Sequence, residues 1–161
     1  MNSSQQTATT SLLEQLIENG SIDAEIIEPG VPTPTVSDAA RALGVEERQI
    51  IKSLLFAAKT GEVVLVVLSG ASKVSRQRLR EVTGLRGLEL ADPALVLERT
   101  GYPAGGTPPV GHTSQLDVIV DEGVMALPVA IGGGGRIDAL LQITPAEIAR
   151  MTQAKVARVA D

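Results

Sequence analysis

The stretch QIIKSLLFAAKTGEVVLVVLS, Gln49–Ser69, decides the fold of this chain. Two apolar runs, Gln49–Ala57 and Glu62–Ser69, flank the turn residues Thr60 and Gly61, which is the pattern of two strands joined by a turn. Successive side chains of a strand point to opposite faces, and both faces of the first run are apolar apart from one Lys and one Ser. We therefore expect other elements to cover this strand on both faces.

The rest of the sequence predicts short helices and strands around the hairpin. Apolar spacing, cap residues and terminal Gly or Pro predict helices at residues 12–17, 37–43, 75–82, 93–99 and 145–151, with Ser37 as the N-cap of the second. Further strands are expected at residues 88–91, 116–120 and 127–131, while residues 137–143 are mixed in character. Short helices together with a hairpin favour an α+β fold with a mixed sheet over a doubly wound parallel sheet.

The length of the chain sets its domain organisation. The 161 residues, of which 43% are hydrophobic, suit one domain with a proper core. We expect residues 1–10 to form a disordered tail and residues 11–161 a single domain, with Pro29–Pro34 as a connector inside it. The N-terminus lacks a signal-peptide pattern and no apolar run is long enough to span a bilayer, so we expect a cytoplasmic protein.

Composition excludes several chemistries. The chain has no Cys and one His, which rules out disulfides, a thiolate nucleophile, Cys-ligated zinc or iron–sulfur clusters and a His-rich metal site. One Phe, one Tyr and no Trp make base stacking on an aromatic platform unlikely. The pattern G-x-S-x-G of a nucleophile elbow is also missing. No metal or cofactor is required by the sequence.

Charge is distributed unevenly along the chain. The net charge is −5, and residues 1–40 hold six acidic residues and no basic one. A basic stretch follows in Lys73–Arg86, which contains Lys73, Arg76, Arg78, Arg80 and Arg86 against Glu81. This stretch fits either a solvated helix face or a local patch for a polyanion.

Lys52 is the first candidate functional residue, because it interrupts an apolar strand. An unpaired buried ammonium is costly, so Lys52 must reach water, a carboxylate or a ligand. A lysine that extends to solvent from near the strand end fits the pattern, and so does a lysine that holds an anion in a cavity.

Two glycine-rich segments are the other candidates. Seven of the twelve residues in Gly101–His112 are Gly or Pro, which suits either a rigid backbone cradle for a ligand or a long structural turn. Neither a Walker A loop nor G-x-G-x-x-G is present. Gly132–Gly135, followed by Arg136 and Asp138, could line the same cavity or form an exposed hairpin turn.

These residues together resemble the YbaK family of aminoacyl-tRNA deacylases, which is related to the editing domain inserted in bacterial prolyl-tRNA synthetases. The resemblance covers about residues 20–158 and rests on segments in the same order along the chain: Ile50–Leu54, Leu90–Pro93, Thr100–Tyr102, Gly105–Gly111 and Gly133–Arg136. It implies a mixed, barrel-like sheet with flanking short helices. It also implies a freestanding editing enzyme that hydrolyses the ester of a mischarged tRNA, such as tRNA(Pro) carrying Cys, Ala or Ser.

The resemblance also implies roles for individual residues. The matching lysine, Lys52, is needed for activity, the loop Gly105–Pro109 shapes the aminoacyl pocket, and the ribose hydroxyl of the substrate helps to activate water. The expected substrate-binding residues are Ser69, Gly101, Gly105, Gly106, Thr107, Pro108, Pro109, Gly111, His112, Gly133, Gly134, Arg136 and Asp138. Lys73, Arg76, Arg78 and Arg80 are expected to contact the tRNA backbone, in a manner that weakens with salt.

Specificity and partners stay open at this point. Cysteinyl-specific members of the family carry Gln where this chain has His112, and a His near this place bears on amino-acid choice in the inserted domains. The expected partner is the acceptor end of a mischarged tRNA, with prolyl-tRNA synthetase as a second candidate and neither DNA nor membrane involved. Two other functions fit: a non-catalytic module that binds a nucleotide or a tRNA end, and an accessory protein that docks on a synthetase–tRNA complex through the acidic N-terminal segment.

Overall fold

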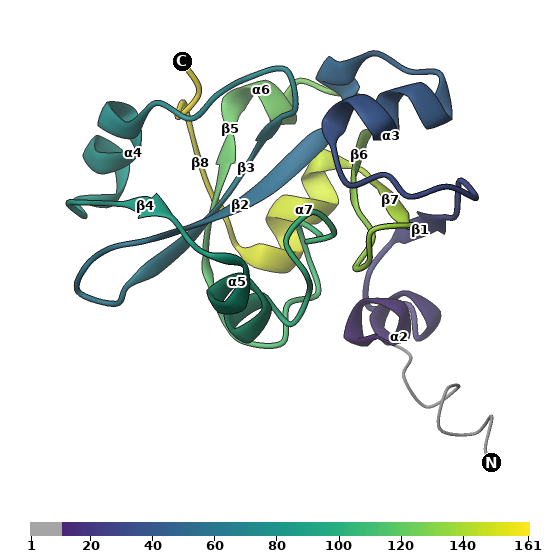
Figure 1. Cartoon of the computed structure of the whole chain (residues 1–161), viewed down its shortest axis with the longest axis horizontal. Helices are drawn as coiled ribbons and strands as arrows, with labels where there is room; N and C mark the ends of the chain where they lie inside the picture. Colours follow the sequence, from purple (N-terminus) through teal and green to yellow (C-terminus); the bar gives the residue numbers. More distant parts are fainter. Residues whose placement is uncertain (1–10) are drawn as a thin grey trace.

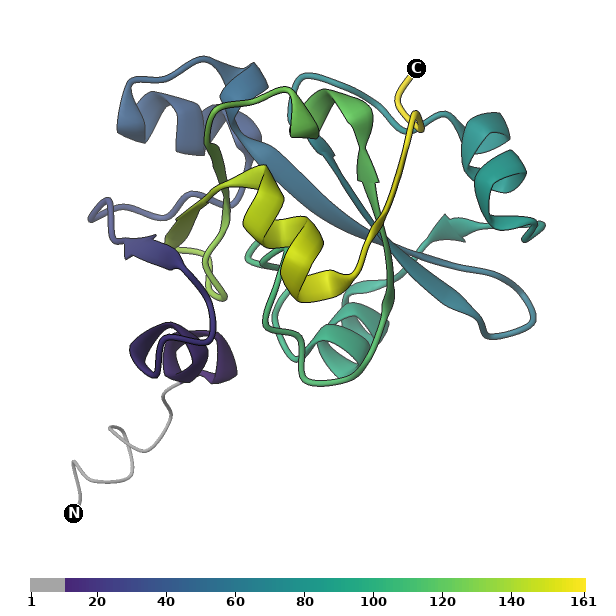
Figure 2. The same ribbon diagram turned by 180° about the vertical axis from the view of Figure 1, so that it is seen from behind.

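The computed structural model describes residues 11–161, which form two sheets with short helices around them (Figures 1 and 2). The expected disordered tail, residues 1–10, lies outside the described residues. The five-stranded sheet has the order β4-β2-β3-β5-β8, and the three-stranded sheet has the order β1-β7-β6. The α+β class with a mixed sheet is confirmed.

The hairpin predicted from the sequence is the centre of the larger sheet. Strands β2 (Ile51–Ala57) and β3 (Val63–Ser69) pair antiparallel along their whole length. The next strands, β5 (Asp117–Asp121) and β8 (Lys155–Ala157), continue the sheet in parallel, and the two-residue β4 (Glu89–Leu90) pairs antiparallel with the end of β2.

The smaller sheet packs beside the start of β2. It consists of β1 (Ala24–Ile27), β7 (Leu140–Ile143) and β6 (Ala130–Gly133), all antiparallel. Within residues 11–161, one parallel bridge between Ile50 and Ile131 is the only strand pairing between the two sheets.

The expectation of a barrel-like sheet is corrected at this junction, because the sheets do not close into a barrel. Gly132 lies next to the Ile51 side chain, but β6 runs on to Gly133 paired with Leu140 of β7 and not with β2. The edge of β2 between the Ile50 bridge and β4 therefore carries no strand in the described part of the chain.

The predicted helices are present with small shifts at their ends. They are α2 (Leu12–Glu18), α3 (Val36–Leu43), α4 (Arg76–Thr83), α5 (Pro93–Thr100) and α7 (Pro145–Thr152). The expected N-cap Ser37 is wrong: Thr35 caps α3, because its hydroxyl accepts the Asp38 amide. Four short elements were not predicted: the strands β1 and β8, the helix α6 (Glu122–Met125) and the 3-10 turn η1 (Glu47–Gln49).

Both faces of the hairpin are covered, as its apolar pattern predicts. Ile51 and Leu55 belong to a core with side chains of α2, α5, α6 and α7 and of the smaller sheet. Phe56 on the other face packs with Leu79 of α4. A third cluster joins α3 to Ile50 and Ile131. In residues 11–161 no helix combines the length and the hydropathy needed to cross a membrane.

Candidate active site

A cleft of ≈ 310 Å³ lies along the uncovered edge of β2. Five segments far apart in the sequence form its walls: residues 33–39, 50–54, 105–107 and 132–133, and Leu140 of β7. The walls are mainly apolar, and their polar side chains are one lysine, one serine and three threonines. No carboxylate or imidazole of residues 11–161 lines this cleft.

Lys52 is half-buried in the wall of the cleft. Its Nζ lies 3.4 Å from the Gly70 carbonyl oxygen, which is a long and weak hydrogen bond. Burial lowers the pKa of Lys52, and the positive charge of Lys73 lowers it further. Lys52 forms no ion pair within residues 11–161, so its charge is available to an anion or an oxyanion in the cleft.

The two glycine-rich segments meet backbone to backbone and form another part of the lining. The Gly135 amide donates to the Gly106 carbonyl (2.8 Å), and a Cβ on Gly106 would lie 2.8 Å from the Arg136 carbonyl carbon. A Cβ on Gly133 would collide with the Thr107 carbonyl oxygen. Glycine is therefore required at Gly106 and Gly133 for close approach. The segment Gly132–Gly135 does lead into the hairpin turn between the antiparallel strands β6 and β7. It is buried or half-buried, so the exposure expected for that turn is wrong.

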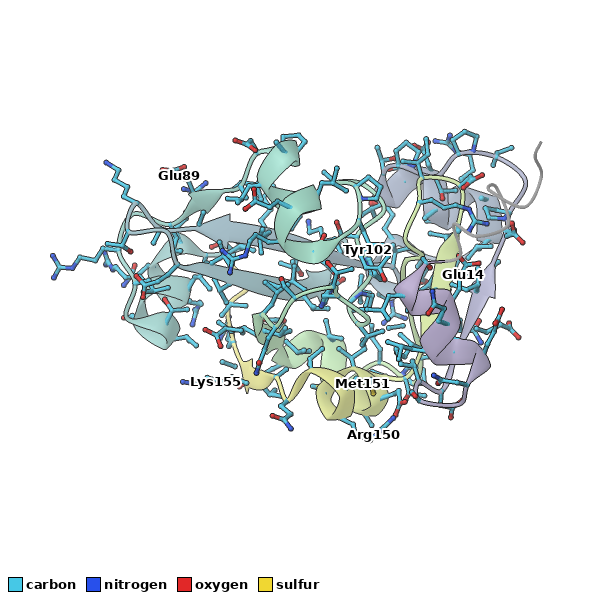
Figure 3. The ribbon with its side chains drawn as sticks, turned by 90° about the horizontal axis from the view of Figure 1, so that it is seen from below. Glu14, Glu89, Tyr102, Arg150, Met151 and Lys155 are labelled. Atoms are coloured by element: carbon cyan, nitrogen blue, oxygen red, sulfur yellow. The ribbon has the colours of Figure 1, made fainter. Side chains whose placement is uncertain are left out.

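Tyr102 and His112 hold the first of these segments in place. The Tyr102 hydroxyl accepts the Leu13 amide (2.9 Å) and donates to the Gly111 carbonyl (2.6 Å), which ties the loop to α2; Figure 3 shows Tyr102 next to this helix. His112 Nε2 lies 2.7 Å from the Pro108 carbonyl oxygen. Because a carbonyl only accepts, this nitrogen carries the proton and donates.

Only some of the predicted site residues line the cleft. Lys52, Gly105, Thr107 and Gly133 line the cleft. The neighbouring residues Gly106, Pro108, Pro109 and Gly134 shape the loops behind it. His112 and Gly111 line a different hollow, between the loop and the end of α7.

The remaining predicted residues make contacts away from the cleft lining. Gly101 ends α5 with φ 87° beside Thr113. The Ser69 hydroxyl donates to the Arg48 carbonyl (3.1 Å) at the end of β3. The roles expected for these residues toward a substrate stay predictions.

Arg136 and Asp138 form an ion cluster on the rim. Arg136 Nε lies 2.8 Å from Asp138, and its terminal nitrogens lie 2.6 Å from Glu28 and 4.0 Å from Glu14. This cluster fastens α2 and the end of β1 to the second glycine segment. The arginine is consequently engaged with protein carboxylates.

The predicted basic stretch does not form one surface at the cleft. Lys73 lies in the loop after β3, and its charge acts on Lys52. Arg76 instead pairs with Glu89 (3.0 Å) and lies 5.9 Å from the Phe56 ring centre. Helix α4, which carries the arginines, and helix α3, which borders the cleft, lie at opposite ends of the molecule (Figures 1 and 2).

Sequence reasoning missed one whole wall of the cleft. Thr33, Pro34, Thr35 and Val36 line it, although residues 29–34 were interpreted as a connector. Thr33 is buried, and its amide donates to the Ile137 carbonyl (2.6 Å). A signal was present, because alternating Pro and Thr make a stiff segment that displays hydroxyl groups.

The lining of the cleft defines a class of site. A cation without an acidic partner and the backbone of two glycine segments line one mainly apolar cleft, which suits a small ligand with a negative or developing negative charge. Within residues 11–161, no group of His, Asp and Glu is placed to hold a metal ion.

The family is established by comparison with known proteins. The family model of the aminoacyl-tRNA editing domain matches residues 31–151, which include every segment of the cleft. The chain belongs to this family.

Relatives with recorded sequences and structures agree with this assignment. Uncharacterized protein YwhH of Bacillus subtilis (strain 168) is 29% identical over 132 residues, which cover 82% of this chain and 83% of that protein. Proline–tRNA ligase of Desulforamulus reducens is 37% identical over 123 residues, which cover 75% of this chain and 21% of the ligase. A solved structure described as a candidate trans-editing enzyme for prolyl-tRNA synthetase is 33% identical with a TM-score of 0.82, covering 93% of this chain and 95% of that one.

Proposed function

We propose that this protein is a freestanding deacylase that hydrolyses the ester between a wrong, small amino acid and the terminal adenosine of a tRNA. The carrying observation is Lys52, which has no acidic partner within residues 11–161 and lines the same cleft as the glycine segments. The match to a proline–tRNA ligase supports tRNA(Pro) as the carrier, and the family resemblance implies Cys, Ala or Ser as the amino acid.

The reaction follows from the charges in the cleft. A water oxygen bonds to the ester carbonyl carbon, and the carbonyl oxygen takes on negative charge. Lys52 stabilises this oxyanion more strongly than the neutral ester, which lowers the barrier. The bond to the ribose oxygen then breaks, that oxygen takes a proton, and the products are the free amino acid and a tRNA with a free terminal hydroxyl.

Proton transfer must be arranged without a side-chain base in the cleft. No imidazole or carboxylate of residues 11–161 lines it, and His112 donates its Nε2 proton to Pro108. We propose that the neighbouring ribose hydroxyl of the substrate positions the water and passes on its proton. The protein then contributes position and electrostatics.

Deacylation of a defined panel tests the proposal. Ala-, Cys- and Ser-tRNA(Pro), with correctly charged Pro-tRNA(Pro), are incubated with the wild type, Lys52→Ala and the control Lys59→Ala, which removes an exposed lysine of the hairpin turn. We expect at least one mischarged species to be hydrolysed, a loss of about 100-fold or more in Lys52→Ala, and no loss in the control. Hydrolysis of none of them, or full activity of Lys52→Ala, would overturn the proposal.

A contact with prolyl-tRNA synthetase is part of the same proposal. Among the acidic residues near the N-terminus, Glu14 and Glu28 interact with Arg136, whereas Glu18 and Glu25 are exposed. Deletion of this segment is unsuitable because Leu13 belongs to the core. Glu18→Lys with Glu25→Lys should weaken co-sedimentation with the synthetase while hydrolysis of free mischarged tRNA persists; unchanged co-sedimentation would exclude this surface.

A further inference from the structure

Ser53 carries an unusual hydroxyl group in the wall of the cleft. Its Oγ is the only buried side-chain oxygen or nitrogen in residues 11–161 that has no hydrogen-bond partner. Buried polar groups in proteins are nearly always paired, so an exception at a ligand cleft indicates a partner supplied by the ligand.

The other hydroxyls of the cleft are already used. Thr33 Oγ1 donates to the Ile137 carbonyl (3.3 Å), Thr35 Oγ1 donates to the Asp38 carboxylate (2.7 Å), and Thr107 Oγ1 donates to the Pro103 carbonyl (3.0 Å). Ser53 is therefore the one hydroxyl of the cleft that can give its proton to a new acceptor without breaking a bond inside the protein.

Ser53 lies at the uncovered edge of β2. The Ile50 carbonyl accepts the Gly70 amide, so the even-numbered residues of this strand bond to β3 and the backbone of Ser53 faces the other side. No strand of the described chain covers that side between the Ile50 bridge and β4. Rotation about the Cα–Cβ bond moves Oγ among three staggered positions, which lets it follow a ligand group at this edge.

Charge limits which ligand group fits beside Ser53. An aminoacyl ester offers a carbonyl, an ammonium, the neighbouring ribose hydroxyl and the amino-acid side chain, and the ribose hydroxyl is engaged with the attacking water in the proposed reaction. Lys52 lines the same cleft as Ser53, and the charge of Lys73 acts on Lys52, so a second ammonium is repelled from this part of the cleft. The carbonyl, as it gains negative charge, is the group suited to Lys52. A neutral hydroxyl on the amino-acid side chain is the group that remains for Ser53.

We propose that Ser53 selects the amino acid to be removed and favours those with a side-chain hydroxyl, serine and threonine. This inference rests on the proposed function and names the substrate class of the same cleft. Alanine leaves the Ser53 hydroxyl unpaired, and cysteine, which resembles serine in shape, forms only a weak hydrogen bond. We expect Ser-tRNA to be hydrolysed about 10- to 100-fold faster than Ala-tRNA or Cys-tRNA, since sites that bond a substrate hydroxyl discriminate against analogues lacking it.

Two variants separate this role from a structural one. Ser53→Ala removes the hydroxyl at the cleft, and Ser37→Ala removes an exposed hydroxyl on α3 as the matched control. Rates are measured on Ser-, Thr-, Cys- and Ala-tRNA(Pro). Binding of non-hydrolysable seryl- and alanyl-amide analogues of adenosine is measured in parallel, and thermal unfolding checks the fold.

The expected result is a change in the ratio of the deacylation rates on Ser-tRNA and Ala-tRNA. Ser53→Ala should lose about tenfold or more on Ser-tRNA, keep its rate on Ala-tRNA and bind both analogues alike, with an unfolding midpoint no lower than that of the wild type. Ser37→Ala should match the wild type.

The contrary results are distinct from one another. Equal wild-type rates on serine and alanine substrates, or an equal loss on all substrates in Ser53→Ala, would overturn this inference and leave the proposed function standing. Wild-type protein that hydrolyses no substrate and binds neither analogue would overturn the proposed function, and this inference with it. If the wild type binds the seryl-amide analogue more tightly than the alanyl-amide analogue, Ser53→Ala loses this preference and no substrate is hydrolysed, selection by Ser53 would be supported and the proposed deacylase activity overturned.

Discussion

Two regions along the central hairpin carry positive charge and differ in what surrounds it. Lys52, at one end of β2, is half-buried in a cleft and has no acidic partner within residues 11–161. Arg76 of α4, over Phe56 near the other end, is exposed, and its guanidinium pairs with Glu89 and the Leu88 carbonyl. Figure 3 places Glu89 and Glu14 toward opposite ends of the molecule.

This difference teaches that the number of charges does not locate an anion site. An exposed, paired cation contributes little binding energy, because water and its partner already stabilise it. A half-buried cation without a partner has lost hydration and gains more from a ligand. The sequence concentrates basic residues on α4, yet the single lysine at the cleft is the better site for chemistry.

The largest loss of activity should come from a change in the glycine segments that line the cleft with Lys52. Gly133→Ala forces a Cβ into the Thr107 carbonyl, so the two glycine segments must separate. We expect deacylation to fall by about 100-fold, since a displacement of about 1 Å at a site has this effect. The control is Gly61→Ala at the hairpin turn, where an added Cβ meets nothing within 4 Å but φ is 96°. It should lower the unfolding midpoint and spare kcat/KM; equal activity losses in both would contradict the close-packed cradle.

A smaller loss of activity should follow from removing the hydrogen bond that holds the loop Gly101–His112 in place. His112→Ala deletes the hydrogen bond to Pro108 without touching the cleft lining. We expect kcat/KM to fall by about tenfold for every amino acid alike, because the net value of such a bond is about 1–1.5 kcal/mol. If the ratio between amino acids changes instead, His112 contacts the substrate and the resemblance to the inserted editing domains is the better guide.

The basic helix should contribute less, and through binding alone. Arg76→Ala, Arg78→Ala and Arg80→Ala together should raise the apparent KM for mischarged tRNA about threefold, with kcat preserved. The slope of log(kcat/KM) against log salt should become shallower by about one unit for each tRNA phosphate that the variant no longer neutralises. An aminoacyl-adenosine without the tRNA stem serves as the control and should be unaffected. Unchanged KM and slope would exclude α4 from tRNA binding and leave Lys73 as the basic residue near the cleft.

The smallest expected effect is on acid stability and concerns the ion pair between Glu147 and Arg150, which lies outside both regions. Hydrogen bonds from Arg150 and the Asp23 amide lower the pKa of Glu147 from 4.5 to about 2. A carboxyl with a lowered folded-state pKa stabilises the protein above its unfolded pKa, and the contribution is lost as pH falls from about 4.5 toward 2. Glu147→Gln should therefore show a smaller drop in Tm between pH 5 and pH 2.5 than the wild type. An identical drop would mean that this pair has no role in acid stability.

Local signals accounted for most of the secondary structure. Cap residues and terminal Pro predicted the helices at residues 93–99 and 145–151, and in the structure Asp92 and Thr144 cap them by accepting amide hydrogen bonds. The short strands β1 and β8 were missed because their pairing with β7 and β5 is decided by residues far away in the chain. The barrel was wrong for a similar reason, since closure depends on pairing between distant strands, and within residues 11–161 one bridge from Ile50 to Ile131 is the only pairing between the two sheets.

The site was predictable only in part. Lys52 and the glycine segments stood out because a cation in an apolar strand and a run of Gly and Pro are conspicuous in sequence. Ser53 gave a similar but weaker signal, as a polar residue on an apolar strand face, and its missing hydrogen bond is visible only in three dimensions. Thr33 and Pro34 gave only the signal of a stiff segment with hydroxyl groups, because their place in the cleft wall comes from the contact of Thr33 with Ile137.

The sequence by itself determined the hairpin, the capped helices and the presence of one unusual lysine, because alternation, capping and the cost of burying charge act over a few neighbouring residues. The tertiary structure decided which charge remains unpaired, which hydroxyl lacks a partner and where His112 lies. Those properties depend on close contacts between segments that are distant in the sequence, such as Gly106 and Arg136, which are thirty residues apart. A pattern over a few neighbouring residues cannot predict such contacts.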